Sequence, residues 1–178
     1  MSDIRSSAAG AVQHGGRLRT ELLGIYLNDH LAGAIVGTRR AQHMVTTLQG
    51  SELAEALEPI AGEIAQDRAS LLDIMRRLGV PARRYKVYAG QLVETVGRLK
   101  SNGRLIRRSP LTSVAELEFL RLGVEGKAAG WRTLRRLSGS DERLDQQGLD
   151  ELLERAQRQL RTLEDLRLRE AQTVFRTT

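Results

Sequence analysis

Residues 51–78, SELAEALEPIAGEIAQDRASLLDIMRRL, decide the fold. Large apolar side chains recur in this stretch at helical spacing, which predicts an amphipathic helix with one apolar face. Ser51 is suited to cap the start of the helix, and Gly79 followed by Pro81 is suited to end it. The predicted stripe consists of Leu53, Leu57, Ile60, Ile64, Leu71, Met75 and Leu78. A helix with such a stripe must pack against other helices to bury it.

One acidic residue, Asp67, falls on this stripe between Ile64 and Leu71. Glu63 lies one turn earlier, so the two carboxylates are expected to point to nearly the same side of the helix. A carboxylate that faces a core must be paired, bound to a ligand or neutralised, because burying it bare costs several kcal/mol. The sequence therefore predicts a polar centre inside the helical core.

The rest of the chain continues the helical pattern. Further long helices are predicted at 18–48, from Ser109-Pro110 to 137, and from Asp145 or Asp150 to 175, with a shorter helix at 82–99. The turn Gln49-Gly50 is short, so the first two long helices should be antiparallel neighbours. Residues 1–17 are predicted to form a mobile tail and 18–178 one domain. The connection through 82–99 is long enough to cross the bundle between the second and third long helices.

Composition supports an all-α protein and excludes several classes. The chain has 178 residues, only 3 prolines, 3% aromatic residues and no cysteine. The absence of cysteine excludes disulfides, thiolate chemistry and cysteine-bound metals. No apolar run is long enough to suggest a signal peptide or a membrane span, so a cytoplasmic protein is expected. Glycines at helical spacing (Gly33 and Gly37, then Gly123, Gly126 and Gly130) predict close helix crossings.

Three segments resemble poorly characterised bacterial proteins of the ferritin-like superfamily: 26–34 (YLNDHLAGA), 63–72 (EIAQDRASLL) and 117–131 (LEFLRLGVEGKAAGW). The resemblance implies a four-helix bundle with a helical crossover between helices two and three, and pairing into a homodimer. Ferritin-like di-iron enzymes carry Glu-x-x-His motifs. Here the only histidines are His14, His30 and His43, and none follows a glutamate three residues earlier. The scaffold is therefore expected without the usual iron ligands.

A residual metal centre is the first candidate site. Carboxylates with one imidazole could hold a divalent metal, and hard oxygen ligands favour Mn, Mg or Ca over zinc, while the family resemblance points to Fe or Mn. The candidate ligands are Asp29, His30, Glu63, Asp67, Glu118 and Glu125. The alternative is a salt-bridged core seam, because Arg68, Lys127 and Arg167 lie near the same stripes.

A basic segment is the second candidate site. The net charge is +6, but residues 76–108 alone carry +9 and the remainder −3. Together with Tyr85 and Tyr88, these cations could bind an anionic partner such as a nucleic acid. The candidate residues are Arg83, Arg84, Lys86, Arg98, Lys100, Arg104, Arg107 and Arg108. A solvated basic face is the alternative interpretation.

The sequence thus favours a ferritin-like helical bundle that is noncatalytic and acts through interaction or assembly. A metal-binding protein or metal-dependent oxidoreductase is the second hypothesis. An anion or nucleic-acid binder is the third. The lone Trp131 falls on the apolar stripe of its helix and is interpreted as a core residue.

Overall fold

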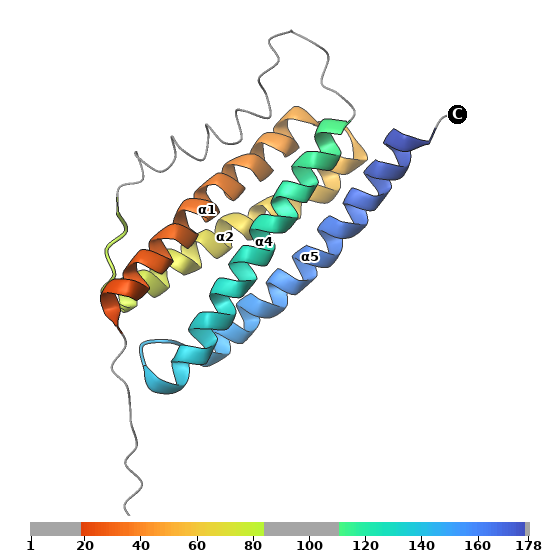
Figure 1. Ribbon diagram of the computed structural model, residues 1–178. Helices are drawn as coiled ribbons and strands as arrows, with labels where there is room; N and C mark the ends of the chain where they lie inside the picture. Colours follow the sequence, from red (N-terminus) through yellow and green to blue (C-terminus); the bar gives the residue numbers. More distant parts are fainter. Residues whose placement is uncertain (1–18, 84–110, 177–178) are drawn as a thin grey trace, which may run out of the picture.

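The computed structural model describes residues 19–83 and 111–176 (Figure 1). These residues form long α-helices and one short 3₁₀ helix, and no described residue belongs to a strand. The prediction of an all-α protein is therefore confirmed. The elements are α1 (Thr20–Thr47), α2 (Glu52–Arg77), α4 (Leu111–Leu137), η1 (Ser138–Ser140) and α5 (Gln146–Phe175).

Local signals in the sequence set the helix ends. The hydroxyl of Ser51 accepts a hydrogen bond from the backbone N–H of Ala54 at 3.2 Å, so Ser51 caps α2 as predicted. At the other end of α2 the chain turns at Gly79, whose φ of 69° favours glycine. The carboxylate of Asp145 accepts from the N–H of Gly148 at 3.1 Å, which makes Asp145 the cap of α5. The predicted tail at 1–17 and all but two residues of the predicted helix at 82–99 lie outside the described residues.

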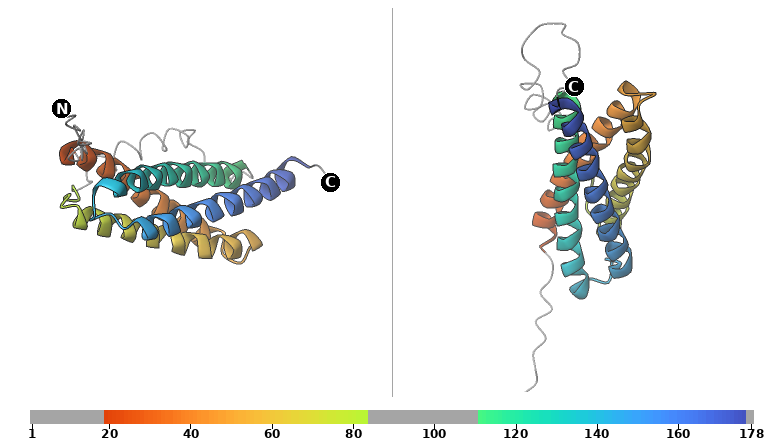
Figure 2. Two further views of the ribbon diagram at one scale, coloured as in Figure 1. Left: turned by 90° about the horizontal axis from the view of Figure 1, so that it is seen from below. Right: turned by 90° about the vertical axis from the view of Figure 1, so that its right-hand side faces the viewer.

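The helices form two antiparallel hairpins packed side by side (Figures 1 and 2). One hairpin is α1 with α2, and the other is α4 with α5. The start of α1 meets the end of α4, where the hydroxyls of Tyr26 and Thr133 lie 3.1 Å apart. The end of α1 meets the start of α4 through an ion pair of 3.0 Å between Arg40 and Glu116. Helices α1 and α4 are therefore antiparallel. Because α1 and α2 are antiparallel as well, α2 and α4 run in the same direction. The end of α2 and the start of α4 thus lie at opposite ends of the bundle.

The core runs along the middle of the bundle. Leu117 and Leu134 of α4 and Leu163 of α5 are completely buried, as are the small side chains of Ala128 and Ala156. Small residues let neighbouring helices approach closely, and α4 and α5 form the most extensive contact in the described part of the chain. The pair α2 and α5 is in much looser backbone contact. Long polar side chains fill the space between these two helices.

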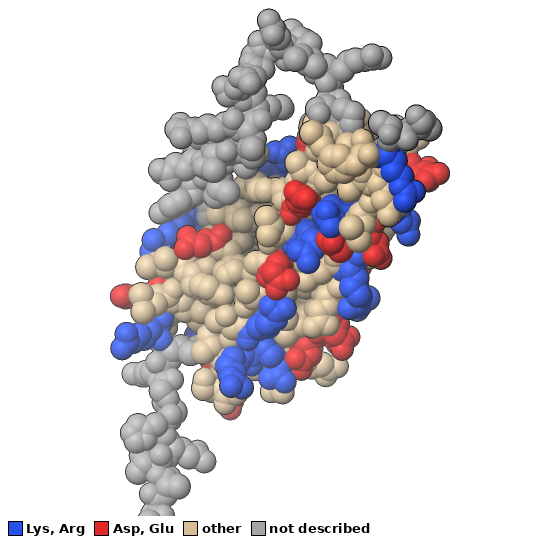
Figure 3. Space-filling view, turned by 45° about the vertical axis from the view of Figure 1, so that its right-hand side comes forward, with Lys and Arg blue, Asp and Glu red and all other residues tan. Residues whose placement is uncertain are grey.

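Charged side chains of both signs alternate on the face that includes α5 (Figure 3). Several pair across α4 and α5, for example Arg121 with Glu164 at 3.0 Å and Arg135 with Asp150 at 2.7 Å. Such exposed pairs contribute little to stability individually. Among the described helices, none is both long enough and apolar enough to cross a membrane.

The chain leaving α2 is fastened to α1 by Asn28. Its amide donates to the carbonyl oxygen of Pro81 at 3.2 Å, and its side-chain oxygen accepts from the backbone N–H of Arg83 at 2.9 Å. Asn28 is buried, so these bonds satisfy a polar group that would otherwise be costly. Arg83, one of the predicted anion-binding residues, is therefore held by its backbone beside the start of α1.

Candidate functional site

Asp67 lies at the centre of the bundle and is 1% exposed. Lys127 of α4 donates to its Oδ2 atom at 2.5 Å, and Nη1 of Arg155 in α5 lies 3.2 Å from its Oδ1 atom. Burial lowers the pKa of Lys127, and the neighbouring Asp67 carboxylate acts in the opposite direction. The prediction of a buried carboxylate is confirmed, and its partners are two cations.

Gln159 of α5 connects the groups of this centre. The residue is 2% exposed, and its Oε1 atom accepts from Lys127 at 2.5 Å. Its Nε2 atom donates to Glu63 at 2.8 Å and to Asp67 at 3.2 Å. Gln159 therefore forms hydrogen bonds with both carboxylates of α2 and with one cation of α4. Gln159 interrupts the apolar stripe of α5 between Ala156 and Leu163, and this interruption is the sequence signal that could have identified it.

The six proposed metal ligands are not brought together. Glu118 and Glu125 are 54% and 50% exposed and pair with Arg167 and Arg132, so the prediction that they face the centre is wrong. The reason is that Leu117, Leu120 and Val124 occupy the buried face of α4. Asp29 is also exposed. Throughout 19–83 and 111–176, no three His, Asp or Glu side chains are grouped as a metal site requires.

The predicted anion-binding set falls mostly outside the described residues. Of its eight members only Arg83 is described, and its side chain is exposed. The other seven, Arg84, Lys86, Arg98, Lys100, Arg104, Arg107 and Arg108, lie within 84–110. The hypothesis of a basic interaction segment therefore stays a prediction.

A cavity of about 610 Å³ lies between α1 and α4, and we call it the α1–α4 groove. Residues within 26–37 of α1 and 119–134 of α4 form its walls, and Ile64, Asp67, Arg68 and Leu71 of α2 lie at its base. Most of the surface that lines it is apolar. Leu122, which is 67% exposed, lies at its edge. Pockets for small molecules have volumes of roughly 300–1,000 Å³ and mostly apolar walls, as this groove does.

Glycines form much of the groove wall, where close helix crossings were predicted. Within residues 19–83 and 111–176, no atom of another part of the chain lies within 4 Å of a Cβ atom placed on Gly33, Gly37, Gly123 or Gly126. No described helix makes the predicted close crossing at these four residues, where the groove is open instead. It is correct at Gly130, where a Cβ atom would lie 3.1 Å from the imidazole of His30. The missing side chains leave the volume of the groove free.

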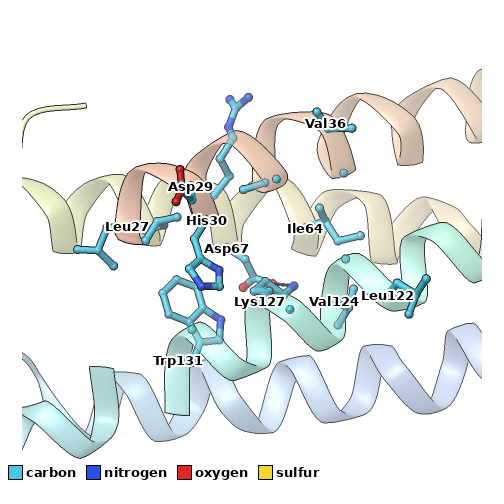
Figure 4. A pocket seen from close by; sticks show the side chains of 18 of the residues that line it. Leu27, Asp29, His30, Val36, Ile64, Asp67, Leu122, Val124, Lys127 and Trp131 are labelled. Carbon is cyan, nitrogen blue, oxygen red and sulfur yellow. Dashed lines mark hydrogen bonds and ion pairs between the residues drawn. The ribbon is translucent and has the colours of Figure 1, made fainter. Parts of the chain in front are cut away.

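His30 and Trp131 lie at one end of the groove and point toward each other (Figure 4). The ring of His30 meets that of Tyr26 edge to face, with centroids 4.4 Å apart. Burial lowers the pKa of His30, while the charge of Asp29 acts to raise it. His30 is therefore predominantly neutral at pH 7, with one ring nitrogen able to donate and one able to accept a hydrogen bond.

We expect the half-buried His30 to make the protein less stable in mild acid. Its pKa is lowered in the folded state, so below pH 6.5 the unfolded chain binds more protons and the free energy of unfolding falls as pH falls. The urea midpoint should drop more between pH 7.5 and pH 5 in the wild type than in His30→Gln. Equal drops in the two proteins would contradict this assignment.

Two residues that line the groove each carry a buried hydrogen-bond donor without an acceptor among the described residues. The donors are the indole Nε1 of Trp131, which is 3% exposed, and Nε of Arg68, a half-buried residue. The guanidinium of Arg68 also forms no ion pair with any described carboxylate, so the predicted pairing of Arg68 with the core acids is not found among the described residues. Arg68 is thus a cation in an apolar groove with no partner from the described chain.

The chain matches no known protein family, no curated protein and no solved structure.

Proposed function

We propose that this protein is a noncatalytic binding protein that takes up an apolar partner in the α1–α4 groove. The observation that carries the proposal is the groove itself, a cavity of about 610 Å³ with mostly apolar walls and four glycines that leave it open. Removing apolar surface of a ligand from water would supply the binding free energy. Polar groups at its base would orient the ligand.

The centre of the bundle supports binding in preference to metal chemistry. A metal at Asp67 would have to displace both Lys127 and Arg155, which already neutralise the carboxylate. The hydrogen bonds of Gln159 would be lost as well. We therefore assign the ion pairs at Asp67 to the stability of the scaffold.

We further propose that the scaffold has the one-crossover topology of ferritin-like bundles. Helices α2 and α4 run in the same direction, and α2 ends at the opposite end of the bundle from the start of α4 (Figure 1). When two successive helices run in the same direction, the chain that joins them must return along the length of the bundle. Ferritin-like folds have one such connection, whereas up-down-up-down bundles have none.

The uncharged fluorescent probe N-phenyl-1-naphthylamine tests the groove. We expect one saturable site on the wild type and at least a tenfold weaker affinity in Gly33→Leu/Gly126→Leu, because both new side chains would project where the groove is open. Replacing glycine inside a helix also favours the fold by up to about 1 kcal/mol each, so the variant should remain folded. Gly62→Leu is the matched control, since Gly62 lies in α2, has open space around it and does not line the groove.

Retained affinity in Gly62→Leu with loss in the double variant would support the proposal. Equal affinity in all three proteins, or no saturable binding to the wild type, would reject it. Circular dichroism at 222 nm would verify that the helices of each variant are intact.

A further inference from the structure

The unpaired guanidinium of Arg68 indicates what kind of ligand the groove would select. The Nε atom of Arg68 is buried without an acceptor, which is costly for a polar group, and an anion that pairs with the guanidinium would offset this cost. Asp67, the adjacent residue, already has two cationic partners, Lys127 and Arg155. No described carboxylate pairs with Arg68, so an anionic group on a ligand could complement it.

We propose that the α1–α4 groove binds a carboxylic acid with an apolar chain, whose carboxylate pairs with Arg68 and whose chain lies along the glycine-lined walls. This inference rests on the proposed binding function and adds the chemical class of the ligand. A guanidinium matches a carboxylate because its parallel N–H groups can donate to both oxygens. The cavity volume of about 610 Å³ and the apolar lining suit one chain of this kind.

The other polar groups of the groove agree with an acceptor on the ligand. The indole N–H of Trp131 is a donor only, and no residue in the described ranges accepts from it. Lys127 has its ammonium engaged by Asp67 and Gln159. Arg68 of α2 and Trp131 of α4 thus both line the groove and both carry a donor that no described residue uses. A cationic head group would meet the guanidinium of Arg68 and be repelled.

Trp131 provides a direct signal, because it is the only tryptophan of the chain and lines the groove. Dodecanoate, used below its micellar concentration, should change the Trp131 emission in a saturable manner and displace N-phenyl-1-naphthylamine. Dodecyltrimethylammonium has the same chain length with a cationic head and is the matched probe. We expect it to bind at least tenfold more weakly than dodecanoate.

Arg68→Gln tests the head-group contact. We expect it to weaken dodecanoate binding about tenfold, the scale of one lost hydrogen bond to a charged group, and to leave binding of the neutral naphthylamine unchanged. Arg158→Gln is the control, since Arg158 lies on α5, is exposed and does not line the groove. Its affinity for dodecanoate should equal that of the wild type.

The results separate the ligand class from the proposed function. Equal affinity for the anionic and cationic probes, or an Arg68→Gln variant that binds dodecanoate as the wild type does, would overturn the carboxylic-acid proposal. Binding of the neutral probe in the groove would then still support a binding protein. If neither dodecanoate nor the naphthylamine binds, both proposals fail.

Discussion

Asp67→Ala is expected to lower the free energy of unfolding by about 3–5 kcal/mol, the usual range when one member of a buried ion pair is removed. The substitution leaves Lys127, whose side chain is only 15% exposed, without its carboxylate partner. Because Asp67 opposes the effect of burial on Lys127, its loss should also lower the pKa of this ammonium further. Urea unfolding of the purified variant at pH 7 measures the change.

A double substitution at Asp67 and Lys127 shows whether the unpaired charge or the lost packing causes the loss of stability. Asp67→Leu combined with Lys127→Met removes both charges and fills the space with apolar atoms, an exchange that is often neutral or stabilising. Arg155 would remain, but its side chain is 24% exposed and can reach water. We expect the double variant to be clearly more stable than Asp67→Ala. A double variant as unstable as the single one would contradict the ion-pair explanation.

Asp150→Ala is the control for the general effect of removing an aspartate. Asp150 pairs with Arg135 at 2.7 Å, but its side chain is 50% exposed. Exposed pairs contribute at most about 1 kcal/mol. A loss at Asp150 as large as that at Asp67 would show that burial is not the cause of the difference.

The helices could be predicted from the sequence because their signals are local. The stripe of residues 51–78, the cap at Ser51 and the stop at Gly79 each depend on residues within a few positions of one another. The same periodicity placed Asp67 on the buried face, and the structure confirms this. Local signals determine how a helix begins, ends and orients its side chains.

The partners of Asp67 could not be predicted in full because they come from distant helices. The position of Lys127 on its stripe predicts it as a partner, but Arg155 and Gln159 of α5 are not predicted. Arg167, the other predicted cation, pairs instead with Glu164 at 2.6 Å and with Glu118 at 3.7 Å. Which side chain on α5 reaches α2 depends on how far apart the helices pack. The spacing of apolar residues in one helix does not contain that information.

The α1–α4 groove could not be predicted either, because it also depends on how far apart two helices pack. A glycine in a helix can permit a close crossing or leave open space, and the sequence is the same in both cases. Gly130 illustrates the first, beside His30, and Gly126 the second. Only the separation of α1 and α4 decides between them. The sequence predicts Arg68 as a partner for the core acids, whereas in the structure it lines the groove one residue after Asp67.

Trp131→Ala should cost about 3–5 kcal/mol of stability, because the indole is 3% exposed and its removal leaves a large cavity. Trp131→Phe should be at least about 1 kcal/mol less damaging, since it keeps an aromatic ring that fills most of the space. Its own cost should be small, because the N–H that it removes is buried and has no acceptor in the described chain. Thermal and urea unfolding measure both variants. A hydrogen-bonded indole N–H would be lost in both variants, and the acceptor left behind would add about 1–3 kcal/mol to each cost. A small cost for Trp131→Phe would therefore agree with an N–H that has no acceptor, whereas a cost close to that of Trp131→Ala would contradict it.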